Sequence, residues 1–373
     1  MKLFFLPLIN FIKYLRIKEK ENLLIFYSES KFYREHFIDL IVHLKKTKQK
    51  NIFFVSSDYE DYLYHKNILD SLYLGNKFFL HLFFQILRCK CMIMTLTDLG
   101  NNLKKSIHCQ NYVYFFHSIA SIRTRYTNNA FVNYDVVLTN GEYQKKELTE
   151  YEDILNFPKK KIINVGYFFL DNLANKAKFN ITNRKNILFA PSWNYNKKNL
   201  FDDYGIAIVD NLIKNNFEVT LRPHPEHYKR SPEVIKKIIS KFTGNNNFYL
   251  DKKFSNLDSL EKSCLLVTDN SSIDMEYVLL FKKPLIYLNY TPKIHNDEYQ
   301  LIKSEDIDVE FKKIFGNSLD IEKLEELTEL IKRLTSAEKD DKIVELFKKK
   351  YLSNVGNSSK FASEYIMSNI LKK

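Results

Sequence analysis

The chain has 373 residues, which is long for one domain and favours two. Hydrophobic residues make up 45% of it, so the composition excludes a largely disordered protein. Glycine occurs only 8 times, and no G-x-G-x-x-G or Walker A pattern is present, which excludes the glycine-rich phosphate loops. The formal net charge of +12 either suits anionic partners, such as nucleotides, polyphosphates and acidic lipid surfaces, or reflects only a Lys-rich surface. Because the sequence has no zinc-finger spacing and no RNA-binding signature, we expect no nucleic-acid partner.

Residues 1–16 form an apolar N-terminal segment with one early lysine and interruptions at Pro7 and Asn10. The segment is shorter than the about 20 apolar residues that span a bilayer, and no cleavage site of a secretory signal follows it. Two interpretations remain open. The segment is either a helix packed on the protein body or an amphipathic helix that lies on an anionic membrane surface.

Strand-like and helix-like patterns alternate through residues 17–175, which we expect to form the N-terminal, acceptor-side domain. The predicted strands are 23–28, 52–57, 91–97, 112–116, 136–139 and 162–165. The predicted helices between them are 32–46, 59–72, 77–87 and 144–150. This alternation is typical of a parallel sheet covered by helices, so we predict a doubly wound α/β domain.

Residues 176–320 repeat the pattern and are predicted to form a second, donor-binding domain. Its predicted strands are 186–190, 218–222, 248–250, 265–268 and 285–288, and its helices are 204–215, 232–242 and 272–281. Residues 321–373 are charged and helical, and we expect them to pack across both domains. Two Rossmann-like domains would then face each other across a cleft, with ligands beyond the carboxyl ends of the strands.

The cysteines contain no C-x-x-C pair, and at least Cys91 and Cys264 lie in strand-like runs, where a thiol behaves as a small hydrophobe. This usage indicates a reducing, cytoplasmic compartment. The spacing of Cys89, Cys91 and His108 is poor for metal ligands, so we expect no metal site.

The segment Asp269-Asn270-Ser271-Ser272 follows an apolar strand and begins a helical pattern. Asp, Asn and Ser cap helices, so exposed N–H groups and two hydroxyls are expected at this helix start. Such a helix start binds anions and commonly holds phosphate. We therefore expect Ser271 and Ser272 to bind a donor phosphate, with Asp269 on the nucleotide side of the site.

Two other strand ends carry polar residues of the same kind. Arg222-Pro223-His224-Pro225 holds an arginine and a histidine on a rigid turn, and both side chains can bind phosphate oxygens. The alternative is a stiff loop with a solvated arginine and a capping histidine. In Ala190-Pro191-Ser192-Trp193, Ser192 can donate to a phosphate, while Trp193 is equally compatible with packing at a hinge.

His117 follows the predicted strand 112–116, so it would face the same cleft from the first domain. An imidazole with an ordinary pKa near 6.5 can take a proton from an attacking hydroxyl, although a lone histidine is more often structural. Asp98 is a lesser candidate to orient that site. Arg123 and Arg125 are candidates to hold an anionic acceptor, or are ordinary surface arginines.

The order of these motifs, from the strand-end histidine through A-P-S-W and R-P-H-P to D-N-S-S with a later glutamate and Lys283-Pro284, resembles the CDP-glycerol glycerophosphotransferases. These enzymes are teichoic-acid primases and polymerases, with relatives in capsule synthesis. The resemblance covers roughly residues 112–288. It implies a GT-B fold and the transfer of glycerol phosphate from CDP-glycerol to a hydroxyl, without a required metal or other cofactor.

The resemblance also implies roles for the matching residues. His117 would be the catalytic base, and Arg222 and His224 would meet the phosphates of the donor. Ser271 and Ser272 would bind its pyrophosphate. Glu276 would lie near the ribose.

Three functions are compatible with the sequence. The first is a cytoplasmic transferase, peripheral to the inner face of the membrane, that moves a polyol phosphate to a lipid-linked or oligosaccharide acceptor. The second is a GT-B glycosyltransferase that uses a nucleotide sugar for capsule or lipopolysaccharide synthesis. The third is a basic membrane-surface scaffold that retains a nucleotide-binding fold without catalysis.

Overall fold

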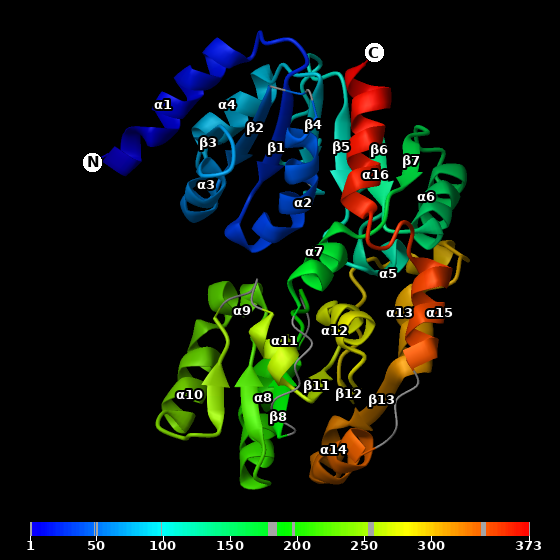
Figure 1. Cartoon of the computed structure of the whole chain (residues 1–373). Coiled ribbons are helices and arrows are strands. Elements are labelled where there is room, and N and C mark those ends of the chain that lie inside the picture. The colour runs from blue at the N-terminus through cyan, green and yellow to red at the C-terminus, as the bar shows by residue number, and fades with distance from the viewer. Residues whose placement is uncertain are drawn as a thin grey trace.

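The computed structural model describes residues 2–47, 49, 51–97, 99–177, 185–195, 198–252, 257–336 and 341–372. In Figure 1 the chain forms two lobes, one above the other, and each lobe is built around a sheet flanked by helices. The upper lobe contains α1 (Lys2–Ile17), β1 (Leu24–Ser28), η1 (Lys31–Tyr33), α2 (Arg34–Lys45), β2 (Ile52–Ser56), α3 (Tyr59–Lys66), β3 (Ser71–Tyr73), α4 (Phe78–Ile86), β4 (Cys91–Met94), β5 (Tyr112–Phe115), α5 (Ile122–Arg125), β6 (Val136–Thr139), α6 (Glu142–Ile154), β7 (Lys161–Asn164) and α7 (Phe168–Lys176).

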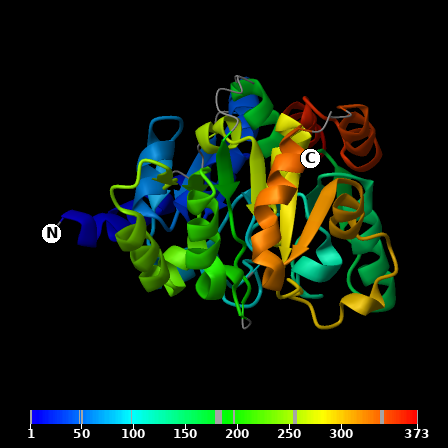
Figure 2. The same cartoon turned by 90° about the horizontal axis from the view of Figure 1, so that it is seen from below.

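The lower lobe repeats this arrangement, and Figure 2 shows its strands from below with helices on both sides. Its elements are β8 (Asn186–Phe189), α8 (Leu200–Lys214), β9 (Glu218–Leu221), α9 (Pro225–Arg230), α10 (Pro232–Phe242), β10 (Phe248–Leu250), α11 (Asp258–Lys262), β11 (Leu265–Thr268), α12 (Ile273–Phe281), β12 (Leu285–Asn289), η2 (Tyr299–Leu301), α13 (Ile307–Phe315), β13 (Gly316–Asp320), η3 (Ile321–Glu326) and α14 (Leu327–Ser336).

The two sheets have the same strand order. The first sheet runs β3-β2-β1-β4-β5-β6-β7 and the second runs β10-β9-β8-β11-β12-β13, with every described pair parallel. In each sheet the order reverses between the first strand and the fourth, at β1/β4 and at β8/β11. Doubly wound sheets bind ligands at this switch point. The predicted α/β fold with two Rossmann-like domains is therefore confirmed, and the topology marks four strand ends as the place for a site.

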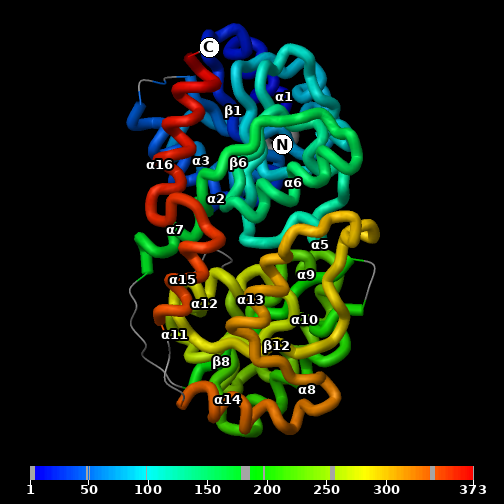
Figure 3. The backbone as a smooth tube through the Cα atoms, turned by 90° about the vertical axis from the view of Figure 1, so that its right-hand side faces the viewer, coloured from blue at the N-terminus to red at the C-terminus, as the bar shows by residue number. Residues whose placement is uncertain are grey.

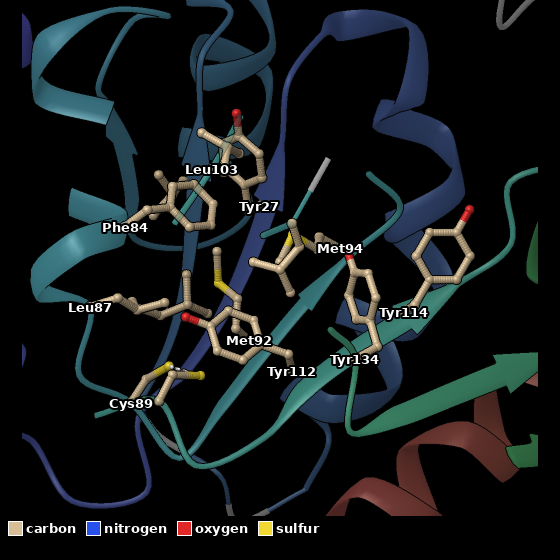
Figure 4. Packing of buried hydrophobic residues seen from close by; sticks show 14 of the residues in the cluster. Tyr27, Phe84, Leu87, Cys89, Met92, Met94, Leu103, Tyr112, Tyr114 and Tyr134 are labelled. Atoms are coloured by element: carbon tan, nitrogen blue, oxygen red, sulfur yellow. Dashed lines mark hydrogen bonds between the residues drawn. The ribbon is translucent and has the colours of Figure 1, made fainter. Parts of the chain in front are cut away.

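The core of the upper lobe explains the strand-like runs of the sequence. In Figure 4, Met92 and Met94 from β4 lie beside Tyr112 and Tyr114 from β5 on one face of the sheet. The residues between them, such as Ile93 and Val113, belong to the hydrophobic cluster on the other face. Because both faces are covered, these strands read as continuous apolar runs.

Two strands were not predicted from the sequence. The predicted helix 59–72 is wrong in its second half, because α3 ends at Lys66 and Ser71–Tyr73 is the edge strand β3, which pairs with β2. Asp58 fixes the start of α3 by accepting bonds from the N–H groups of Glu60 and Asp61. The apolar residues after Lys66 fit either structure, and pairing with β2 decides between them. The edge strand β13 was missed for a different reason, since its five residues carry little hydrophobic pattern.

The C-terminal part of the chain crosses from the lower lobe to the upper one, as the red segment in Figure 3 shows. Helix α15 (Asp341–Tyr351) packs against α12 of the lower lobe, whereas α16 (Ser358–Tyr365) packs against α2 and α7, and η4 (Ile366–Leu371) continues α16. Two glycines make room for the crossing segment. A Cβ on Gly141 would lie 1.8 Å from the carbonyl oxygen of Tyr351, and one on Gly166, at φ +97°, would lie 2.1 Å from that of Ser353.

Helix α1 lies on the outer edge of the upper lobe, next to α4 (Figure 1). Its inner face buries Phe11, Tyr14 and Ile17, and Tyr14 is fully buried. Within the described part of the chain, no helix is long and apolar enough to cross a membrane.

Candidate active site

A cleft of about 710 Å³ lies between the two domains. Its lower wall is formed by three loops, which follow β8, β9 and β11, together with the start of α12. Its upper wall is formed by η1, by the start of α2 and by the loop after β5. Both switch points therefore contribute to one cavity, within the roughly 300–1,000 Å³ range of small-molecule sites.

The start of α12 forms part of the lower wall of the cleft. Ser271 and Ser272 both line the cavity, and Ser272 occupies the capping position of the helix without using its hydroxyl as a cap. Helix α12 has nine residues, so its first N–H groups and its dipole favour a negative charge at this end. The structure thus places the two serines in the cleft, at a helix start whose N–H groups can bind an anion.

Ser192 and Asp269 bind each other instead of facing the cleft. Asp269 accepts bonds from the backbone N–H of Ser192 at 2.7 Å and from its hydroxyl at 2.8 Å, and both residues are buried. Ala190 and Pro191 line the cavity, whereas Ser192 does not. This pair joins the loops after β8 and β11, so it holds the two sides of the switch point together.

Arg222 and His224 both line the cleft beside this loop. The guanidinium of Arg222 donates to the hydroxyl of Ser259 at 3.2 Å and lies 3.7 Å from the carboxylate of Asp251, which fixes its orientation. His224 caps α9, because its Nδ1 accepts from the N–H of Glu226 at 3.2 Å. Burial lowers the pKa of His224 well below its usual value, so the ring is neutral and its Nε2 carries the proton. Nε2 is therefore a hydrogen-bond donor.

His117 lines the opposite wall of the same cleft. Its Nδ1 is 2.7 Å from the hydroxyl oxygen of Thr95, and its ring packs edge-on against Tyr33, with the ring centroids 5.0 Å apart. Burial lowers the pKa of His117 to about 4, so the imidazole is neutral at pH 7. When Nδ1–H donates to Thr95, Nε2 has a free lone pair and can accept a proton.

Tyr167 connects the two walls. Its hydroxyl lies 2.9 Å from the backbone carbonyl oxygen of His117 and 2.6 Å from a carboxylate oxygen of Glu276, which lines the cleft from α12. Burial raises the pKa of Glu276 to about 7. The hydroxyl of Tyr167 has a single proton, so it can donate to only one of these two acceptors at a time. When Glu276 is protonated, Tyr167 can donate to the backbone carbonyl of His117.

The predicted acceptor-side residues are spread over other surroundings. Asp98 lies outside the described residues. Arg123 donates to the carbonyl of Ser304 at 3.0 Å and does not line the main cleft. Arg125 pairs with Asp308 at 2.8 Å and lines a second, smaller cavity between the domains.

The sequence interpretation missed the contribution of the first strand. Lys31, Arg34 and His36 line the upper wall of the cleft, just beyond β1. The Nε and Nη2 atoms of Arg34 and the Nδ1 of His36 are buried without a hydrogen-bond partner among the described residues. His117 was predicted because it is a polar residue that follows a parallel strand. The same argument applies to the polar residues of the loop that follows residue 28, and it could have found them.

The residues whose spacing was judged poor for metal ligands lie in different surroundings. Cys89 and Cys109 are buried with their sulfur atoms 3.4 Å apart, while His108 is exposed. Among the described residues, no group of three or more His, Cys, Asp or Glu side chains is arranged to hold a metal ion.

Comparison with known proteins agrees with these motifs. A sequence model of the CDP-Glycerol:Poly(glycerophosphate) glycerophosphotransferase family matches residues 10–372, which is nearly the whole chain. The chain belongs to this family. It is therefore a transferase of the glycerophosphotransferase type, as the order of the strand-end motifs predicted. A sequence search of curated proteins finds no match.

Solved structures share the fold of this glycerophosphotransferase. A histidine-to-asparagine variant of the wall teichoic acid polymerase TagF, soaked with CDPG, aligns over 98% of this chain and 97% of its own, with a TM-score of 0.59 and 16% identity. The UDP-GlcNAc 2-epimerase of Neisseria meningitidis bound to UDP-GlcNAc aligns over 94% and 100%, with a TM-score of 0.60 and 15% identity. The S. aureus MnaA–UDP structure aligns over 94% and 98%, with a TM-score of 0.59 and 12% identity. At these identities the similarity shows the GT-B fold alone.

Proposed function

We propose that the protein transfers glycerol phosphate, or a related polyol phosphate, from a CDP-activated donor to a hydroxyl of a lipid-linked or oligosaccharide acceptor in cell-surface polymer synthesis. One observation supports this most: the anion-binding start of α12 and the neutral His117 line the same cleft from opposite domains. A phosphoryl-transfer site needs both a cradle for the phosphates and a group that positions or deprotonates the nucleophile.

The proposed reaction begins with the donor diphosphate on Ser271, Ser272 and the first N–H groups of α12. The acceptor hydroxyl gives its proton to Nε2 of His117, and its oxygen attacks the β-phosphorus. The bond from that phosphorus to the bridging oxygen breaks, and CMP leaves with the electron pair. His224 Nε2–H and Arg222 donate toward the leaving phosphate, and donors fixed in advance are commonly the largest catalytic contribution.

The low pKa of His117 is compatible with its role as a base. The bound diphosphate brings negative charge into the cleft, which favours the protonated imidazole and raises its pKa when the donor is present. Glu276 completes the donor site in this proposal, because it lines the cleft and the resemblance to the family assigns it to the ribose.

A nucleotide-sugar donor remains the second candidate, because the similar epimerase structure contains UDP-GlcNAc. The experiment that separates the two measures nucleotide release and product mass with CDP-glycerol, CDP-ribitol and several UDP-sugars. We expect CMP release and a polyol-phosphate product. Release of UDP from a sugar donor, without turnover of either CDP-polyol, would overturn the proposal. Family membership favours either enzyme over the scaffold alternative.

We also propose that the protein works in the cytoplasm, at the inner face of an anionic membrane, through α1. Its outer face exposes Phe5, Leu8, Ile9, Ile12 and Leu15 at helical spacing. Phe78 of the neighbouring α4 is also exposed, at 69%. Lys13 and Arg16 on the same helix add positive charge, as in helices that lie in the membrane interface.

The double substitution Ile9→Ser and Ile12→Ser tests the membrane proposal, because both side chains are exposed and the fold does not need them. We expect it to reduce cosedimentation with vesicles containing phosphatidylglycerol by roughly ten-fold, since each change removes part of the inserted apolar area. The matched control is Leu346→Ser, which removes a similarly exposed side chain from α15. Equal cosedimentation of all variants would exclude α1 as the contact.

A further inference from the structure

A second cavity of about 420 Å³ lies between the domains, separate from the main cleft. Its upper part is lined by residues from the segment after β4 and from the end of α5. Its lower part is lined by residues that follow β8 and β12. The volume is within the range of small-molecule sites and is large enough for one sugar or polyol unit.

This cavity adjoins both reacting parts of the proposed site. Arg125, which lines it, donates from Nη1 to the backbone carbonyl of Asn270 at 3.2 Å, and Asn270 directly precedes Ser271. Tyr126, its neighbour in the lining, packs edge-on against Phe116, with the ring centroids 5.7 Å apart. Phe116 directly precedes His117. The loop with Ser271 therefore lies between the main cleft and the second cavity.

The lining has the chemistry of a site for a neutral, hydroxyl-rich group. Tyr126, Tyr195 and His295 supply aromatic surface, and the rings of the last two lie 5.6 Å apart. Thr97 and Thr127 supply hydroxyls. The charge of Arg125 is already balanced by Asp308, and Asp297 adds a carboxylate, so the cavity is not built to attract an anion. Aromatic walls with a few placed polar groups are typical of small-molecule recognition.

We propose that the terminal sugar or polyol unit of the acceptor binds in this second cavity, an inference that rests on the proposed transferase function. In phosphoryl transfer the attacking and leaving oxygens lie roughly in line on opposite sides of the phosphorus. The cavity adjoins the Ser271 loop and the strand end that carries His117. In this proposal the acceptor's hydroxyl reaches past the loop to the β-phosphorus and attacks it opposite the leaving oxygen, beside His117.

The test fills the cavity without disturbing the core. Thr127 is exposed at the rim, so Thr127→Trp places a large ring in the cavity. We measure the KM for octyl lactoside as the acceptor probe, together with the Kd of CDP-glycerol and the melting temperature. We expect the acceptor KM to rise at least ten-fold, while the donor Kd stays within two-fold of wild type. Thr243→Trp, at an exposed position of the lower lobe, is the matched control.

A second variant, Tyr195→Ala, removes aromatic surface from a half-exposed position of the same cavity, and we expect its acceptor KM to rise as well. An unchanged acceptor KM in both variants would overturn the proposal. A raised donor Kd in both would assign the cavity to the donor and would also overturn it. Failure of the transferase function itself gives a different result, because the wild-type protein would then neither bind nor turn over any CDP-activated donor.

Discussion

The two walls of the cleft differ in how far apart their residues lie along the chain. The lower wall consists of three short motifs, each within four consecutive residues, at the ends of neighbouring parallel strands. The upper wall combines His117 with Lys31, Arg34 and His36, which are more than 80 positions earlier in the chain. We propose that the two walls have different roles: the lower wall binds the donor, and the upper wall performs the proton transfer.

The largest expected effect comes from the upper wall. His117→Ala removes the proposed base, and we expect kcat to fall by roughly 10²–10⁴-fold, the usual range for a general base. Donor affinity should remain within about three-fold, because the anion site belongs to the other domain. Steady-state kinetics and a donor-binding titration check the two parts separately.

The control for this prediction is His81→Ala, which removes an exposed histidine of the upper lobe and should leave both quantities unchanged. A folded His117→Ala protein with near-normal kcat would refute the role of His117. A large loss of donor affinity instead would show that the two walls do not divide the work as described.

A smaller effect is expected from the lower wall. His224→Asn keeps an oxygen acceptor for the N–H of Glu226, because asparagine caps helices well, but it removes the Nε2 donor that faces the cleft. We expect kcat to fall by roughly 10²-fold, as when one preorganised donor to developing charge is lost. The measurement is kcat with CDP-glycerol, together with the melting temperature.

His224→Ala separates the two roles of this histidine. It should lose the same factor in kcat and, in addition, about 1 kcal/mol of stability from the missing cap. If His224→Asn retained full activity and only His224→Ala were impaired, the histidine would be a structural cap, which is the alternative that the sequence left open.

The fold could be predicted from the sequence because its strands are buried on both faces and are separated by periodic helices. Much of the lower wall could be predicted because its chemistry is local: Arg222 directly follows β9, and His224 and Ser271 come three residues after the ends of β9 and β11. The mutual bond of Ser192 and Asp269 could not be predicted, since it joins positions 77 residues apart. The same holds for Tyr167 and Glu276, 109 residues apart, which meet only when the domains face each other.

The smallest expected effect concerns this contact between the walls. Because burial raises the pKa of Glu276 to about 7, the carboxyl is mostly protonated at pH 6 and ionised at pH 8. Ribose hydroxyls donate more strongly to the ionised form, so donor affinity should rise by roughly five-fold between these values, equivalent to about 1 kcal/mol. In the free protein, the pKa of His117, near 4, and the low pKa of His224 keep both rings neutral over this range.

The variant Tyr167→Phe tests whether Tyr167 contributes to this pH dependence of donor affinity. The bond from Tyr167 lowers the pKa of Glu276, as does the charge of Arg222, whereas Asp274 raises it. Removing the phenolic hydroxyl should therefore move the midpoint of the affinity profile to higher pH. Tyr277→Phe removes another buried hydroxyl from the same helix, one that binds Ser263 instead, and should leave the midpoint unchanged. The affinity profiles are measured by donor titration from pH 6 to 8.5. Equal profiles for wild type and Tyr167→Phe would show that Tyr167 does not influence the pKa of Glu276.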